Sequence, residues 1–275
     1  MNVKHLRKQL MAAIAMVVVA GVALSSATYA WFVSNNSVTA TTTSIAAQSN
    51  SAYLLIANKA AGATTADSAS IAVNKSEDDT IALYPAQWKN GFDASKKKVG
   101  TEGAGAAVYQ FESAYASATG APAEKDNTRF AVGDPAAAVT AKYAYLNTFY
   151  VGTGKYDGVF ENLKVTGMEV TATNSNQLTG AIRLLVKCGD AWVVAKVGDS
   201  GFEIESQSGS DGIINAGKFG KSTTGEGAVH DVQVDVYVYY DGADAKVYSD
   251  NLDKINTAGV SATVTFEATP TEFGK

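Results

Sequence analysis

Cysteine, histidine and charge are all scarce in this chain of 275 residues. The one cysteine, Cys188, excludes an internal disulfide framework. With His5 in a basic N-terminal segment, His230 is the only histidine left for the rest of the chain, and one histidine cannot supply the H-E-x-x-H pair of a zinc protease. Charged residues make up 18% of the sequence, and Lys96–Lys98, the longest run of cations, is typical of a solvated loop, so we expect no nucleic-acid partner.

Sequence motifs of catalysis are missing as well. There is no G-x-S-x-G nucleophile turn and no glycine-rich phosphate loop. The acidic turn from Asp241 to Asp244 lacks the spacing of an EF-hand, and no pair of carboxylates stands out for glycoside hydrolysis. Cys188 lies in an apolar alternation, which favours a small core residue over a thiol paired with His230. We therefore predict that the chain is not an enzyme and has no catalytic residue, metal or cofactor.

The N-terminus has the features of an export signal. A basic segment up to Lys8 is followed by the apolar run Leu10–Leu24 and by small residues that end at Ala30. We predict a signal peptide over residues 1–30, with an apolar helix and cleavage between Ala30 and Trp31. The alternative is a retained membrane anchor, because the uncharged stretch is long enough to span a bilayer. Residues 1–30 hold three of the 22 basic groups and none of the 27 acidic groups, so cleavage leaves an acidic protein of net charge −8.

The C-terminal half predicts antiparallel strands. In the segment from Val260 to Thr269, apolar and polar residues alternate with the period of two that a half-buried strand requires, and Pro270 is expected to end the ladder. The same alternation runs through Val232–Tyr240 and through Ile182–Cys188, which Gly189-Asp190 should turn into a hairpin with Ala191–Val197.

Two further features of this half can be assigned. In Ile182–Cys188 we expect Arg183 and Lys187 to point outward. Tyr143–Val151 predicts another strand, and a change of parity near Gly167 predicts a β-bulge. A short helix over Asp250–Ile255 is the only helical candidate of this half, and it is weak.

This pattern predicts an all-β fold, an antiparallel jelly-roll or β-sandwich. Residues 57–140 are rich in small residues, with strand candidates at Thr80–Trp88 and Ala107–Tyr115. We interpret them as a large insertion into a domain over residues 31–275; a separate small domain is the alternative. Aromatic residues on the strands suggest a carbohydrate-binding surface, although cross-strand packing or burial under the insertion is the favoured interpretation. They are Trp192, Tyr237, Tyr239 and Tyr248.

Residues 31–50 form an uncharged, Thr/Val-rich segment beside the predicted cleavage point. Such a strand either pairs within its own sheet or adds to the edge of a neighbouring molecule. The residues we expect to lie in a donor strand are Phe32, Val33, Val38, Ala40, Thr42 and Ile45. The candidates for the acceptor sheet are Val260, Ala262, Val264 and Phe266, on the apolar face of the last strand.

Both chain ends resemble those of the TasA and camelysin family of exported bacterial proteins. The resemblance rests on the leader junction Ser26–Phe32 and on the last strand, Ala262–Thr269. It implies a jelly-roll domain that polymerises into biofilm matrix fibres, in which the N-terminal strand of one subunit inserts into the sheet of the next. Camelysin is described as a metalloprotease, but this chain has no recognisable zinc site, so that activity is not expected here. The insertion has no clear counterpart in the family.

The expected function is therefore that of a structural subunit in extracellular fibres, in the matrix or at the cell surface of a Gram-positive-type bacterium. The expected partners are other copies of the chain, joined head to tail, a signal peptidase during export, and matrix or surface proteins. The alternatives are a monomeric cell-surface adhesion or carbohydrate-binding module and a pilin-like subunit that keeps its apolar helix. No type IV prepilin processing pattern precedes the apolar run, which disfavours the second alternative.

Overall fold

The computed structural model describes residues 37–41, 45–47, 54–57, 83–114, 129–154, 158–172, 179–221, 231–244, 247 and 260–273. In these residues the chain is predominantly β-strand, and the strand ladders are antiparallel. The elements are β1 (Ser37–Thr41), β2 (Ile45–Ala47), β3 (Leu55–Ala57), β4 (Ala86–Asp93), β5 (Ala107–Ser113), β6 (Ala131–Gly133), α2 (Pro135–Thr140), β7 (Tyr145–Gly152), β8 (Gly158–Ala172), η2 (Thr179–Ala181), β9 (Ile182–Cys188), β10 (Ala191–Gly198), β11 (Gly201–Gln207), β12 (Ile213–Asn215), β13 (Phe219–Lys221), β14 (Val232–Tyr240) and β15 (Val260–Phe273).

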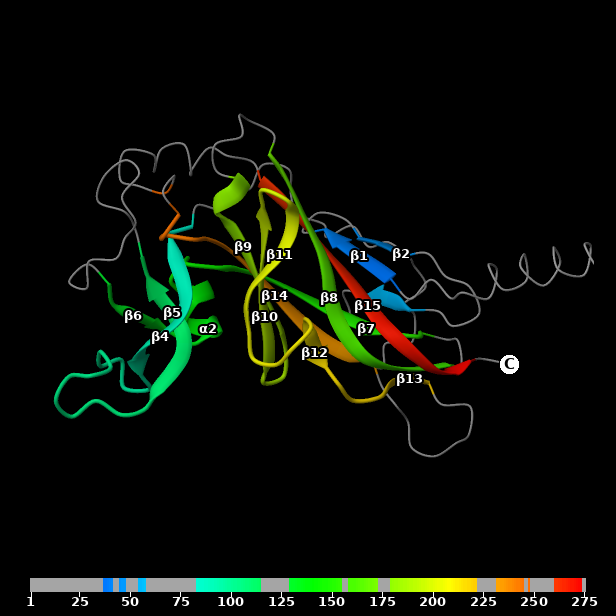
Figure 1. Cartoon of the computed structure of the whole chain (residues 1–275), viewed down its shortest axis with the longest axis horizontal. Helices are drawn as coiled ribbons and strands as arrows, with labels where there is room; N and C mark the ends of the chain where they lie inside the picture. Colours follow the sequence, from blue (N-terminus) through cyan, green and yellow to red (C-terminus); the bar gives the residue numbers. More distant parts are fainter. Residues whose placement is uncertain are drawn as a thin grey trace, which may run out of the picture.

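The strands form two large sheets and one small sheet. The first, which we call the β8–β15 sheet, has the order β12-β8-β15-β1-β2, with β13 also paired to β8. The second, the β9–β14 sheet, has the order β11-β10-β9-β14-β7-β3. The third, the insertion sheet, has the order β4-β5-β6. Figure 1 shows the insertion sheet on the left, beside the β9–β14 sheet, and the long strands β8 and β15 crossing the right of the molecule.

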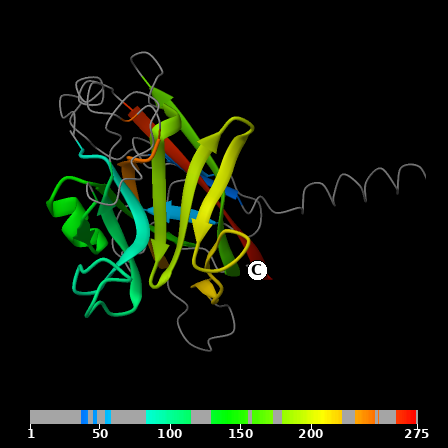
Figure 2. The same cartoon turned by 60° about the vertical axis from the view of Figure 1, so that its left-hand side comes forward.

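The two large sheets pack face to face around one core, which makes this part of the chain an all-β sandwich. Every second residue of β8 and β15 points into the core and meets every second residue of β9 and β14, as the period of two requires. Phe160 and Phe266 on one sheet and Phe149 on the other are almost completely buried. Figure 2 shows the same layering after rotation, with β9, β10 and β11 in front of β15.

Most strand predictions are confirmed. In β15, Ala262, Val264, Phe266 and Ala268 are buried, whereas the residues between them are partly exposed. The predicted hairpin is formed by β9 and β10, with Cys188 opposite Ala191. The register of β8 against β15 shifts between Thr265 and Phe266, opposite Gly167, where the change of parity predicted a bulge.

The prediction that Pro270 ends the last strand is wrong. β15 continues to Phe273, and Pro270 lies opposite Phe160 of β8. Register shifts occur on both sides of the proline, between Glu267 and Thr269 and between Pro270 and Glu272. A bulged ladder tolerates a residue without an N–H donor, which is why the strand does not stop there.

The predicted insertion contributes a sheet of its own that rests on the sandwich. Its first strand, β4, begins and ends later than the predicted Thr80–Trp88, of which residues 80–82 lie outside the described residues. β5 agrees with the predicted Ala107–Tyr115 as far as Ser113; Ala114 is not in the strand, and Tyr115 lies outside the described residues. A second core, which we call the insertion core, joins the two parts. It consists of Ala86, Trp88, Phe111, Val132, Ala138, Ala144, Leu185, Trp192, Val194, Tyr237 and Tyr239. Because about half of these residues belong to β9, β10 and β14, the insertion sheet is packed against the β9–β14 sheet rather than separate from it.

The short helix α2 closes the outer side of the insertion core. Asp134 precedes it, and the Asp134 carboxylate accepts a hydrogen bond from the backbone N–H of Ala137 at 2.8 Å. Pro135 follows at the first helical position, where a missing N–H costs nothing, so the sequence Asp-Pro starts the helix by a capping side chain and a preset φ. Ala138 is the residue that the helix buries.

Candidate functional site

The strand predicted to act as a donor lies on the last strand of the same chain. β1 pairs antiparallel with β15, with Val38 opposite Phe266 and Ala40 opposite Val264. Ile45 of β2 lies opposite Ala40, so that β2 forms the outer edge of the sheet. Of the other predicted residues, Ala30, Trp31, Phe32, Val33 and Thr42 lie outside the described residues.

The predicted acceptor residues lie on β15, which pairs with β8 along one edge and with β1 along the other. Ala262, Val264 and Phe266 point into the sandwich core, and Val260 pairs through its backbone with Ala172 of β8. The opposite edge of β15 holds β1 over the register Thr263–Glu267. The predicted donor and the predicted acceptor therefore meet, and they meet within one molecule.

Without β1 and β2, β15 would be the edge of its sheet. Over Thr263–Glu267 this edge has no proline and only one charged residue, Glu267 at its end. Edge strands elsewhere in the sandwich carry the usual protection against pairing: β3 is three residues long, and β11 carries Glu203 and Glu205 in ion pairs. A free β15 edge would thus be the part of the two large sheets best able to bind another strand.

A second feature, missed in the sequence, is a cluster of charged and amide side chains between the insertion and the sandwich. We call it the polar cluster; it consists of Gln87, Glu112, Arg129, Arg183, Glu205 and Asp241. Arg183 of β9 contacts Asp241 at 2.9 Å through Nη2 and Glu205 at 3.0 Å through Nε. Gln87 of β4 donates to the Asp241 carboxylate at 3.1 Å, which extends the cluster into the insertion.

The cluster continues through the insertion sheet. Arg129 donates to Gln87 at 2.9 Å and to Glu112 at 2.8 Å. Glu112 is completely buried, and its other oxygen accepts from the backbone N–H of Gly91 at 2.6 Å. An unbroken series of hydrogen bonds and ion pairs therefore runs from β5 to β11, and it fixes how the insertion sheet sits on the sandwich.

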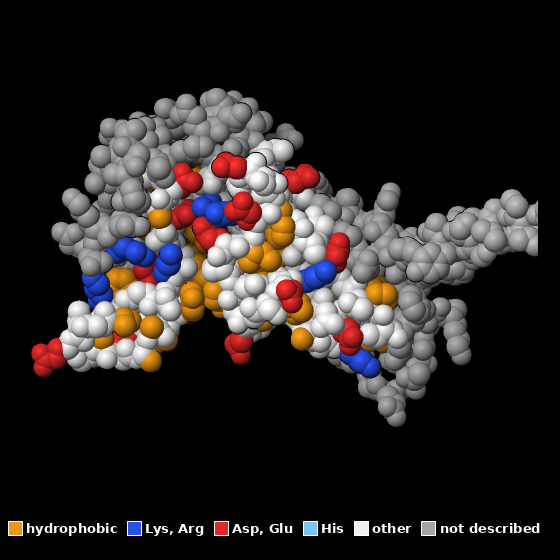
Figure 3. All heavy atoms as spheres, in the orientation of Figure 1, with side chains coloured by type: hydrophobic (Ala, Val, Ile, Leu, Met, Phe, Trp, Pro, Cys, Tyr) orange, Lys and Arg blue, Asp and Glu red, His pale blue; other side chains and the backbone are white. Residues whose placement is uncertain are grey.

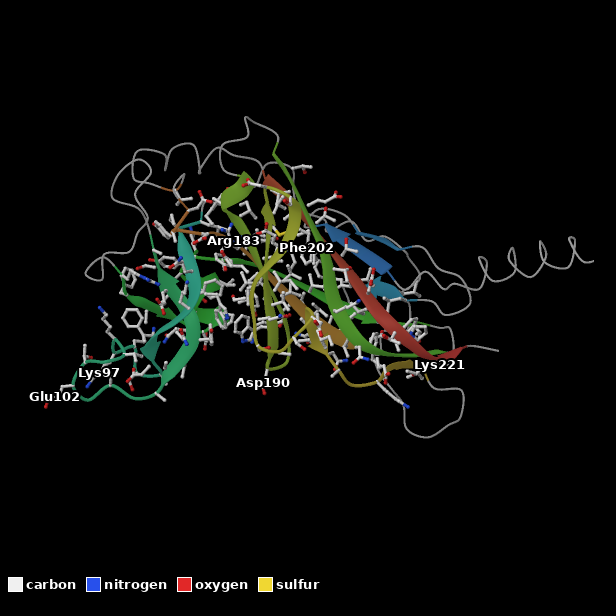
Figure 4. The ribbon with its side chains drawn as sticks, in the orientation of Figure 1. Lys97, Glu102, Arg183, Asp190, Phe202 and Lys221 are labelled. Carbon is white, nitrogen blue, oxygen red and sulfur yellow. The ribbon has the colours of Figure 1, made fainter. Side chains whose placement is uncertain are left out.

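Burial and the charge of the ion-pair partner act in opposite directions on the pKa of Asp241 and on that of Arg183. Burial raises the pKa of Asp241 above its ordinary value, and the Arg183 charge and the N–H donors of Ala243 and Gln87 oppose that rise. For Arg183, burial disfavours the charge, but the Asp241 and Glu205 carboxylates outweigh it and raise the pKa of the guanidinium. Figure 4 places Arg183 between the insertion sheet and the sandwich, near the upper end of β9.

Arg183 corrects one sequence prediction. It does point away from the sandwich core, as the alternation predicted, but its side chain is only 6% exposed because the insertion covers that face. Lys187, on the same face, is partly buried. Strand β9 is therefore buried on both faces over Ile182–Val186, which a single alternating strand cannot reveal.

The backbone beside Asp241 shows how closely the two parts approach. The N–H of Gly242 donates to the carbonyl of Ala86 at 3.0 Å. A Cβ atom at position 242 would collide with the carbonyl oxygen of Ala114, so this position requires glycine. Asp241 and Gly242 therefore contact the insertion in addition to forming the turn after β14.

Metal-ligating side chains and the Cys188 thiol are candidate reactive groups in the part of the chain that the structure describes. No set of three or more His, Cys, Asp or Glu side chains could hold a metal ion among these residues. Burial, with a contribution from Asp235, raises the pKa of the Cys188 thiol, which keeps the thiol protonated and unreactive at neutral pH. His230 lies outside the described residues.

Three of the four aromatic residues considered for sugar binding are buried. Trp192, Tyr237 and Tyr239 all belong to the insertion core, and Tyr248 lies outside the described residues. Burial, together with the Asp235 and Asp134 charges, raises the pKa of Tyr237 to about 12. Among the residues that the structure describes, the large apolar side chains that are exposed lie instead on the insertion: Tyr84, Val99, Tyr109 and Phe130.

The described residues contain no helix with the length and apolarity needed to cross a membrane. Comparison of the chain with protein-family models, with curated proteins and with solved structures finds no match.

Proposed function

We propose that this chain is an exported structural subunit that polymerises into extracellular fibres by donating its N-terminal strand to the next subunit. The observation that carries the proposal is the pairing of β1 with β15 across Val38–Phe266 and Ala40–Val264. If the same ladder forms between two molecules, each subunit completes the sheet of its neighbour. Such a head-to-tail contact does not close on itself, and it propagates as a filament.

The finer fold proposed is a jelly roll. We count eight strands in chain order: β1–β2, β7, β8, β9, β10, the β12–β13 region, β14 and β15. One sheet contains, as successive neighbours, the first, last, third and sixth strands. The other contains the second, seventh, fourth and fifth. This order, in which successive strands lie in opposite sheets except for the fourth and fifth, supports a jelly roll with the insertion between its first and second strands. In this arrangement the first strand borders the last, which makes the first strand the natural one to exchange.

The pairing of β1 with β15 within one molecule also suggests that polymerisation needs a trigger. Exchange replaces each intramolecular β1–β15 ladder by an identical intermolecular one, so the free-energy difference is small and protein concentration decides the outcome. We propose that export by way of a signal peptidase cutting at Ala30–Trp31 frees the strand outside a Gram-positive-type cell. Matrix or surface proteins would then be further partners of the fibre.

Negative-stain electron microscopy tests this function. Chains beginning at residue 31 are expected to form filaments, and chains beginning at residue 48, which lack β1 and β2, are expected to remain monomeric. Adding the donor peptide of residues 31–47 to the shortened chain should give a one-to-one complex. Filaments from the shortened chain would refute strand donation, and monomers from both chains would favour the monomeric adhesion module.

A further inference from the structure

A row of four side chains crosses the β9–β14 sheet on the face that carries the insertion. Thr148 of β7 lies opposite Asp235 of β14, Asp235 opposite Lys187 of β9, and Lys187 opposite Trp192 of β10. Asp235, Lys187 and Trp192 are each two positions from a residue of the insertion core on their own strands. Thr148 is two positions from Leu146, which packs against that core, so all four point to the same face. With strands ~4.8 Å apart, the row is about 14 Å long, which is the length of two to three sugar rings.

Aromatic rings of the insertion stand at one end of this row. The Tyr109 ring of β5 lies 4.6 Å from the Trp192 ring and is stacked at 6.3 Å on the Trp88 ring of β4. Tyr109 is 45% exposed, whereas both tryptophans are buried. An exposed ring held in place by two buried rings is a rigid platform, and Figure 3 shows apolar side chains gathered where the insertion meets the sandwich.

Two donors beside the platform are unused by the described part of the protein. The Trp88 indole N–H is buried without a hydrogen-bond partner. The Lys187 ammonium lies 5.7 Å from the centre of the Trp88 ring, and in the described residues it makes no hydrogen bond or ion pair. Burial lowers the pKa of Lys187, and the nearby Asp190 and Asp235 charges only partly offset this effect. Because Lys187 is only partly buried, its ammonium is available to donate to a ligand oxygen beside the platform.

The charges beside the row select the kind of ligand. Lys187 lies between carboxylates, because Asp235 is its cross-strand partner and Asp190 follows it in the hairpin turn, at the lower tip of β9 in Figure 4. Asp235 already accepts hydrogen bonds from Thr148 at 2.8 Å and from Gln233 at 3.1 Å, and a carboxylate can accept more. Alternating donors and acceptors without a net positive charge match hydroxyl groups, which donate and accept, and disfavour an anion.

We propose that the junction of the insertion with the β9–β14 sheet binds a neutral polysaccharide, with one sugar ring on Tyr109 and sugar hydroxyls on Lys187 and Asp235. The apolar C–H face of a pyranose ring packs on an aromatic face, and its equatorial hydroxyls reach the polar row. The site lies within a single subunit, so it is present whether or not the chain polymerises. The insertion would then attach the protein to a glycan of the matrix or cell surface.

A titration of the full-length expressed and purified protein with neutral hexasaccharides tests this proposal. The probes are cellohexaose, laminarihexaose, maltohexaose and chitohexaose, with polygalacturonate as the anionic comparison. The emission of Trp88 and Trp192 reports binding. At least one neutral probe should saturate the emission change, and Tyr109→Ala should weaken its binding roughly tenfold or more.

Matched variants separate binding from folding. Tyr84 is also exposed on the insertion, at 60%, but its ring lies tilted against that of Tyr143 and not against Trp88 or Trp192, so Tyr84→Ala should change affinity less than about twofold. Tyr109→Phe keeps the platform and should bind within about threefold of the unaltered protein, and Lys187→Met should weaken binding by about threefold or more. The proposal is overturned if no neutral probe binds, if only polygalacturonate binds, or if Tyr109→Ala binds as tightly as Tyr84→Ala.

Discussion

Replacement of Arg183 by methionine tests whether the polar cluster holds the insertion on the sandwich. The substitution keeps most of the side-chain volume but leaves the Asp241 carboxylate, on a side chain that is 10% exposed, with only neutral donors. Removing one partner of a buried ion pair costs about 3–5 kcal/mol. We therefore expect the free energy of unfolding at pH 7 to fall by roughly that amount, measured by urea denaturation with tryptophan emission.

The pH dependence of the penalty identifies its cause. Burial already raises the pKa of Asp241, and loss of the Arg183 charge, which opposes that rise, should raise it further. A carboxyl whose pKa is raised in the folded state adds stability below its unfolded pKa of about 3.9, and that contribution is lost as the pH rises through the folded pKa. The stability difference between the unaltered protein and Arg183→Met should therefore shrink to roughly half or less as the pH falls from 7 toward about 4.

Two further variants serve as controls. Adding Asp241→Asn to Arg183→Met removes the unpaired carboxylate and should restore at least about 1 kcal/mol at pH 7. Lys164→Met breaks the exposed ion pair with Glu267 and should cost less than about 1 kcal/mol. A cost of less than about 1 kcal/mol for Arg183→Met, or a cost that does not change with pH, would refute the reasoning.

Three more variants test the two cores and the β4–β5 loop. Phe111 and Phe160 are both completely buried, in the insertion core and the sandwich core respectively, and each change to alanine should cost about 3–5 kcal/mol in urea unfolding. Native-state proteolysis should cut the insertion sooner only in Phe111→Ala, and equal cutting in both would contradict the separation of the cores. Asp93 accepts hydrogen bonds from three loop N–H groups, chiefly that of Gly105, which lower its pKa. Asp93→Asn should therefore destabilise at neutral pH, and the difference should vanish below the folded pKa; a difference that persists there would exclude this origin.

Alternation along single strands was enough to predict the sandwich. The apolar positions of β15 and the hairpin of β9 and β10 follow from a period of two and a Gly-Asp turn, and the change of parity at Gly167 located a bulge. These features depend on residues close in the sequence. For that reason they do not require knowledge of what packs on the second face.

The features that were missed depend on contact between distant segments. Arg183 and Asp241 are 58 positions apart, and each has an ordinary local interpretation, as an outward-facing residue and as a turn residue. Their burial results from the insertion covering the sheet. Pro270 was assigned as a strand end because the effect of flanking bulges on the ladder cannot be read from a single strand.

The exposed aromatic platform was missed for a related reason. Trp192 and Tyr237 were candidates because strand alternation put them on an outer face, and the insertion buries both. Tyr109 lies in a segment whose small residues gave little sequence signal, yet its ring is exposed beside the buried Trp88 and Trp192. A pairing of Tyr109 with Trp192, 83 positions away, could not be inferred without the register of the sheets.

The central claim is that β1 leaves its own β15 and pairs with that of another subunit. Thr39 and Thr265 are opposite each other in the β1–β15 ladder, at a spacing that a disulfide can bridge. With Cys188→Ala to remove the natural thiol, Thr39→Cys and Thr265→Cys together should lock β1 on its own strand when oxidised. The account predicts no filaments by electron microscopy from the oxidised protein and normal filaments after reduction. Filaments from the fully oxidised protein, with the disulfide verified within single chains, would contradict strand donation.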